Sequence, residues 1–118
     1  MKNKANILTL TDKNFNHQVL ENHQPVLVHF RTDWSGSSDI ITPIIEELAL
    51  KFAGEVSFGK LDTDNHNQIA MKFGIESVPT LIFFNHGRVV DRTNGIISKS
   101  ELTKKLKALL GKCFLTNQ

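Results

Sequence analysis

The residues best suited to chemistry lie in one short polar turn. Three serines surround a glycine in the stretch Asp33-Trp34-Ser35-Gly36-Ser37-Ser38. A serine nucleophile needs a partner base and a shaped backbone, but this turn holds neither a Gly-x-Ser-x-Gly elbow nor a Ser-x-x-Lys pair. Free N–H groups at a helix start can bind an anion, but Asp39 would repel it and helix capping already explains the serines. Neither a hydrolase nor an anion site is favoured.

Apolar segments on both sides of the turn predict the elements that position it. Residues 26–30, Val-Leu-Val-His-Phe, are mostly apolar, which predicts a buried strand before the turn. Residues 40–52 carry apolar side chains at helical spacing, which predicts a helix after it. Ser37 or Ser38 can cap this helix, and Gly54 is expected to end it.

The remainder of the chain is predicted to alternate between strands and helices and to finish with a hairpin. Further strands are predicted at residues 7–10, 56–61, 80–84 and 88–92, and further helices around residues 15–20, 69–73 and 102–110. Thr11 and Ser98 are the expected caps of the first and last helices. The loop Asn85-His86-Gly87 suits a tight reversal. This order predicts an α/β fold with a mixed sheet and helices on both faces.

Length and composition predict one globular domain. The chain has 118 residues, of which 40% are hydrophobic and 22% charged. We expect a single domain over residues 1–118, with its core at about 5–110 and a C-terminal tail at 111–118. A net charge of +2, with both signs mixed along the chain, argues against nucleic-acid and membrane partners. The five histidines show no metal-ligand spacing, so neither a metal nor a cofactor is expected.

The chain has a single cysteine, Cys113, in the predicted tail. An intrachain disulfide is therefore impossible, and one cysteine fits a reducing compartment. The apolar patch at residues 7–10 is too short for a signal peptide, and no later run could span a bilayer, so we expect a cytoplasmic protein. A monomer is expected, although Cys113 could link two copies through a disulfide.

Three segments, in this order and spacing, resemble the thioredoxin family over about residues 5–110. They are residues 26–43, with the Trp-x-Gly-x-x turn, residues 59–64, and residues 73–81, with Ser77-Val78-Pro79-Thr80. The resemblance implies the thioredoxin fold, a central mixed β-sheet of about five strands flanked on both faces by about four helices.

In the thioredoxin family the turn carries a Cys-x-x-Cys motif, and its two cysteines would fall at Ser35 and Ser38. A thiolate at a helix N-terminus attacks a disulfide, and the second cysteine resolves the mixed disulfide. A thiol, with a pKa near ~8.5, needs only a modest shift to ionise at neutral pH. A serine hydroxyl ionises far higher and forms no exchangeable bond to sulfur. As written, the chain is predicted to have no catalytic residues and to be redox-inactive.

The resemblance also implies a peptide-docking groove beside the turn. The family's proline, here Pro79, is cis and faces the turn, so that Val78 offers its backbone N–H and C=O to an extended peptide. The implied peptide-binding residues are Trp34, Gly36, Ser37, Gly74, Ile75, Val78, Pro79 and Gly95. The competing interpretation is that these residues only maintain the fold.

Several residues near the turn depart from the family pattern. They are His29, Arg31, Ser37 and Asp39, where the family usually has Asp, Trp, Pro and a basic residue. The usual Asp manages the proton of the second cysteine. His29 is interpreted as a hydrogen-bonded core or edge histidine, with a buried pH-sensitive group as the alternative. Without that Asp, Lys60 is expected to reach solvent or a carboxylate such as Asp62.

We therefore expect a redox-inactive protein- or peptide-binding module that uses the groove next to the cis-proline. The alternative is a thiol–disulfide oxidoreductase, a protein-disulfide reductase of cell redox homeostasis, whose cysteines at Ser35 and Ser38 were replaced by serine. Such a replacement would leave the neighbours unchanged, whereas His29, Arg31 and Asp39 also depart, which favours a naturally cysteine-free site. A third interpretation is an interaction domain that uses another face.

Overall fold

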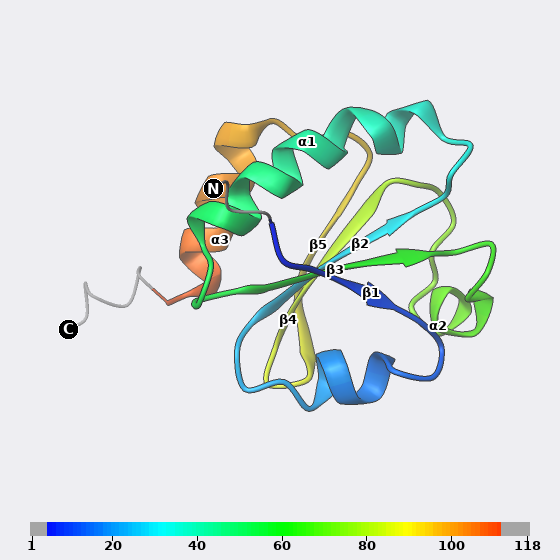
Figure 1. Ribbon diagram of the computed structural model, residues 1–118, viewed down its shortest axis with the longest axis horizontal. Coiled ribbons are helices and arrows are strands. Elements are labelled where there is room, and N and C mark those ends of the chain that lie inside the picture. The colour runs from blue at the N-terminus through cyan, green and yellow to red at the C-terminus, as the bar shows by residue number, and fades with distance from the viewer. Residues whose placement is uncertain (1–4, 112–118) are drawn as a thin grey trace.

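A computed structural model describes residues 5–111, which form a five-stranded sheet between two helical layers (Figure 1). The strands are β1 (Ile7–Leu10), β2 (Val26–Arg31), β3 (Ser57–Asp62), β4 (Thr80–Asn85) and β5 (Arg88–Asn94). The helices are the π-helical segment η1 (Asn16–Leu20), α1 (Gly36–Lys51), α2 (Asn67–Lys72) and α3 (Lys99–Leu109). The predicted α/β fold, with its mixed sheet and helices on both faces, is confirmed.

The strand order β1-β3-β2-β4-β5 decides which loops meet. Strands β1, β3 and β2 run parallel, whereas β4 and β5 run antiparallel to their neighbours. Phe30, near the end of β2, lies opposite Leu61 of β3 and Thr80 at the start of β4. The turn after β2, the loop after β3 and the segment before β4 therefore leave the sheet at the same end.

Both faces of the sheet are buried, which explains why β2 and β4 are apolar throughout most of their length. Leu27 of β2 belongs to the core cluster under α1 and α3, whereas Val28 belongs to the cluster on the side of η1 and α2. Figure 1 shows these two helical layers on opposite sides of the strands. Three rings in the second cluster, those of Phe15, Phe73 and Phe84, pack with centroids 5.4–5.7 Å apart.

The predicted cap of the last helix, Ser98, is confirmed, whereas the predicted Thr11 cap of the first is wrong: η1 follows Phe15 and has no side-chain cap. Ser98 Oγ accepts a hydrogen bond from the N–H of Glu101 at 3.1 Å, ahead of α3. Thr11 Oγ1 accepts from the N–H of Asn14 at 3.0 Å, and Asn14 Oδ1 accepts from the N–H of Thr11 at 2.7 Å. The Ser98 bond satisfies an N–H group that a helix start leaves without a partner, whereas the bonds between Thr11 and Asn14 close the turn that precedes η1.

The predicted cap of α1 is wrong. The helix begins at Gly36, so Ser37 and Ser38 lie inside its first turn rather than ahead of it. The carbonyl oxygen of Ser35 accepts from the N–H of Asp39 at 3.4 Å, so the first helical turn already closes at Ser35. None of the helices among residues 5–111 is long and apolar enough to cross a bilayer.

A two-residue turn, His86-Gly87, joins β4 to β5, with Asn85 ending β4. His86 and Gly87 have φ of 53° and 78°. Positive φ at both positions is what a type I′ turn requires, and its twist matches the flanking strands. Gly87 is further constrained, because a Cβ there would lie 2.7 Å from the carbonyl oxygen of Leu20.

Replacing Gly87 by alanine should lower the free energy of unfolding by about 2 kcal/mol or more, through backbone strain and the contact with Leu20. Urea denaturation measures this loss. Gly54→Ala is the matched control, because Gly54 has a φ of 84° but a Cβ there would meet no atom within 4 Å. Gly54→Ala should therefore show the backbone strain alone, about 1 kcal/mol. Equal losses in the two variants would show that the Leu20 contact is unimportant.

Candidate functional site

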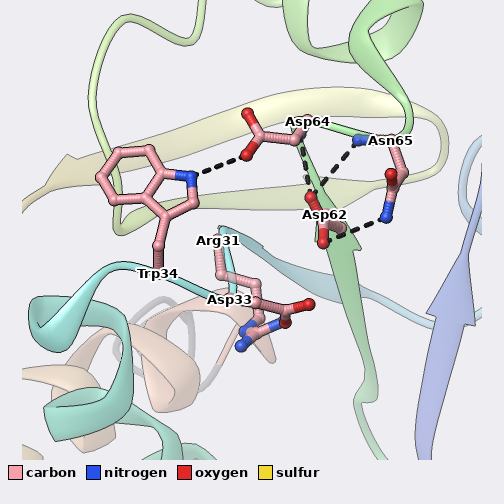
Figure 2. A network of polar contacts seen from close by, with 6 residues as sticks. All are labelled: Arg31, Asp33, Trp34, Asp62, Asp64 and Asn65. Atoms are coloured by element: carbon pink, nitrogen blue, oxygen red, sulfur yellow. Dashed lines mark hydrogen bonds and ion pairs between the residues drawn. The ribbon is translucent and has the colours of Figure 1, made fainter.

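Trp34 is the most prominent side chain at this end of the sheet. Its side chain is 74% exposed, yet its indole Nε1 donates a hydrogen bond to Asp64 Oδ2 at 2.7 Å. Figure 2 shows the contact: Asp64 comes from the loop after β3, and Asp62, the last residue of β3, accepts bonds from the backbone of Asp64 and from Asn65. An exposed aromatic ring held in this way presents apolar surface to a partner without being free to turn away.

The segment before Trp34 is held by an ion pair. Arg31 Nη1 lies 3.0 Å from Asp33 Oδ1, with the arginine side chain mostly buried and the carboxylate exposed (Figure 2). Thr32, between them, is buried. Arg31 therefore contributes an ion pair at the start of the turn. The thioredoxin family, which the sequence resembles, usually has tryptophan at this position.

The turn itself carries serine at the two positions where disulfide exchange would need a cysteine. Ser35 is buried, with 8% of its surface exposed, and Gly36 and Ser37 are exposed at the start of α1. Ser38 lies in the first turn of the same helix. No thiol lies at this turn, because Cys113 is the chain's one cysteine. The predicted Cys113-linked dimer concerns a residue outside the described part of the chain.

The segment before β4 presents backbone groups at the same end. The peptide bond between Val78 and Pro79 is cis, Pro79 is buried, and its carbonyl oxygen accepts from the N–H of Gly95 at 2.8 Å. The N–H and C=O of Val78 take part in none of the loop and turn hydrogen bonds among residues 5–111. Val78 thus has main-chain groups available for an added strand.

Arg92 of β5 fixes the loop that carries Gly74 and Ile75. Its guanidinium donates to the carbonyl oxygens of Phe73 at 2.5 Å and Gly74 at 2.8 Å, while the N–H of Ile75 donates to Ala70. The eight predicted peptide-binding residues therefore come from three neighbouring segments at one end of the sheet. The sequence analysis missed both Asp64 and Arg92, since their roles depend on which loops the strand order brings together.

His29 is buried behind the turn, with 3% of its surface exposed. The expectation that it would be hydrogen-bonded is wrong for Nε2, which has no partner among the described residues. Burial, and secondarily the charges of Arg31 and Lys60, lower the pKa of His29 from 6.5 to about 4. Lys60 is exposed and pairs with no carboxylate in the described part of the chain, Asp62 included. The alternative, a buried group sensitive to pH, fits this geometry.

The described residues hold no group of three histidine, cysteine, aspartate or glutamate side chains that could bind a metal. A mixed five-stranded sheet with a helix-start turn at the same end as a cis-proline defines the thioredoxin-fold class. A family model for thioredoxin matches residues 6–108, and the chain belongs to the thioredoxin family.

The chain is similar to thioredoxins of several organisms. It is 36% identical over 98 residues to thioredoxin 1 of Nostoc sp., covering 83% of this chain and 92% of that protein. It is 37% identical over 101 residues to a thioredoxin of Chlorobaculum thiosulfatiphilum, covering 86% and 94%. With the chloroplastic thioredoxin M4 of Arabidopsis thaliana it shares 39% identity over 101 residues, covering 86% of this chain and 52% of that protein.

Proposed function

We propose that this thioredoxin-family chain binds an extended peptide or unfolded protein segment without exchanging disulfides with it. The docking surface is defined by Trp34, Gly36, Ser37, Gly74, Ile75, Val78, Pro79 and Gly95. The observation that carries the proposal is the exposed indole of Trp34, fixed by Asp64, at the same end of the sheet as the available backbone of Val78.

The two features supply complementary parts of the binding energy. Main-chain hydrogen bonds to Val78 would align a peptide without reading its sequence, as in β-strand addition. Trp34 would bury apolar area against one side chain of the peptide. The serines at positions 35 and 38 leave this docking intact but provide no sulfur for a mixed disulfide. In this proposal the protein acts as a monomer in the cytoplasm, a compartment in which thiols are kept reduced.

Replacing Trp34 by alanine should weaken peptide binding about tenfold or more, because aromatic anchors carry a large share of binding energy. The probe is a fluorescein-labelled insulin B chain with carboxamidomethylated cysteines, and the readout is fluorescence anisotropy. Trp34→Phe should restore part of the affinity.

Val90→Ala is the matched control for this measurement. Val90 is an exposed apolar residue of the edge strand β5 and lies outside the docking surface. Its loss should leave the affinity unchanged. If Trp34→Ala binds normally and Val90→Ala does not, the partner uses another face and the docking proposal is wrong.

The comparisons favour a second candidate more directly than the first. The relatives described above are all named as thioredoxins. In this candidate the parent protein carries out thiol–disulfide exchange with cysteines at positions 35 and 38. Ser35 and Ser38 of the present chain replace those cysteines. The docking surface would then bind the disulfide-containing protein substrate. Introducing cysteine at both positions separates the two candidates.

A further inference from the structure

A second site lies outside the docking surface. A cavity of about 250 Å³ opens between α1 and the edge of the sheet formed by β1, β2 and β3. None of its lining residues belongs to the docking surface. A water molecule occupies about 30 Å³ of liquid, so the cavity has room for a small organic molecule. Neither candidate function above uses this space.

His29 borders the cavity and has a ring nitrogen that lacks a partner. His29 lines the cavity and is almost fully buried, and its Nε2 has no hydrogen-bond partner among residues 5–111. Buried ring nitrogens are normally hydrogen-bonded, because leaving one without a partner costs free energy. Nε2 has less than 1 Å² of accessible surface, so the His29 ring would have to turn before a ligand in the cavity could bond it.

The sheet side of the cavity carries a net positive charge, because Asp33, which also lines the cavity, is paired with Arg31. His29 and Arg31 are two residues apart on β2, and Lys60 lies directly opposite His29 on β3, so the three side chains leave the same face of the sheet. Lys60 has no ion-pair partner in the described part of the chain. Arg31 uses Nη1 to bind Asp33 but keeps further N–H donors. Both cations also lie close enough to lower the pKa of His29.

The helix side carries negative charge. Asp39 and Glu46 of α1 both line the cavity, and their spacing of two helical turns places them on one face of the helix. Both carboxylates are exposed, and neither forms an ion pair within residues 5–111. Ile45 supplies an apolar lining between them. The cavity therefore has opposite charges on opposite walls.

We propose that this cavity binds a small zwitterion of amino-acid size. Its carboxylate would face Arg31, Lys60 and the N–H form of His29 Nε2, and its ammonium group would face Asp39 and Glu46. Lys60 on one wall, and Asp39 and Glu46 on the other, then face opposite charges, and His29 gains a hydrogen-bond partner once its ring turns. A carboxylate alone or an amine alone would satisfy only one wall and approach the like charge of the other.

The test is a thermal-shift and calorimetry screen of the full chain with each of the twenty L-amino acids. Propionate and propylamine serve as controls with one charge each. At least one amino acid should bind with a Kd of about 1 mM or tighter and raise the melting temperature, whereas the two controls at the same concentration should not. In NMR spectra that amino acid should shift the ring signals of His29 and leave those of His17, an exposed histidine paired with Glu21, in place.

Variants decide whether binding occurs in this cavity. Lys60→Gln and Glu46→Gln change exposed side chains and should each weaken binding about tenfold, and His29→Leu should weaken it further. Lys99→Gln, which removes a cation that pairs with Glu47 outside the cavity, is the matched control. No binding by any amino acid, equal binding of propionate or propylamine, or full affinity in Lys60→Gln and Glu46→Gln would each overturn the proposal.

Discussion

Acidification from neutral pH to about pH 4 is expected to remove about 3 kcal/mol from the free energy of unfolding through His29 alone. The pKa of His29 is about 4 in the folded protein and 6.5 without the fold. Between these values the unfolded chain binds more protons than the folded one, so stability falls as pH falls. Below about pH 4 both states are protonated and the loss levels off.

The surroundings of His29 explain the direction of its pKa shift. Burial removes the water that would solvate an imidazolium, and Arg31 and Lys60 repel it. The carboxylates of Asp33, Asp39 and Glu46 line the same cavity, but desolvation and the two cations outweigh them. The buried histidine therefore destabilises the fold in acid.

The measurement is urea denaturation of the parent chain and of His29→Gln across this pH range. Carboxylate titrations act in both proteins, so the difference between the two curves isolates His29. That difference should change by about 3 kcal/mol between neutral pH and pH 4. Parallel curves, or an NMR titration of the His29 ring with a midpoint near 6.5, would contradict the prediction.

The local elements could be predicted from the sequence because each has its own short-range signal. Ile7–Leu10 has the predicted bounds, and the turn at His86-Gly87 lies where the glycine indicated a reversal. Ser98 caps α3 because a hydroxyl followed by Glu101 favours that geometry wherever the helix goes. Such signals predict local structure correctly because they depend only on residues that are close together in the chain.

The contacts that build the site could not be predicted in this way. Trp34 and Asp64 are thirty residues apart, and only the parallel pairing of β2 and β3 brings their loops together. Arg92 reaches Gly74 through a different pairing, the antiparallel one of β4 with β5, which returns the chain toward the loop before β4. The resemblance to thioredoxins indicated where the turn and Pro79 would meet, but residues specific to this chain could be placed only with coordinates.

Replacing Ser35 and Ser38 together by cysteine should give the chain measurable protein-disulfide reductase activity. Position 35 lies immediately before α1, where the helix dipole and free N–H groups favour a thiolate. At neutral pH His29 is uncharged, so position 29 holds no buried carboxylate that would oppose the thiolate. Arg31 adds a nearby positive charge. Cysteine at position 38 would then resolve the mixed disulfide.

The assay is insulin reduction with dithiothreitol, with the parent chain and Ser35→Cys as controls. The double variant should raise the rate about tenfold or more over the parent, which has no thiol at the turn. The single variant can form a mixed disulfide but lacks the resolving thiol, so it should stay near the parent. Activity confined to the double variant would show that the fold still supports exchange, which strengthens the oxidoreductase candidate. A folded but inert double variant would contradict this prediction and show that departures such as His29 and Asp39 have removed redox competence, which leaves peptide binding as the function of the surface around Trp34.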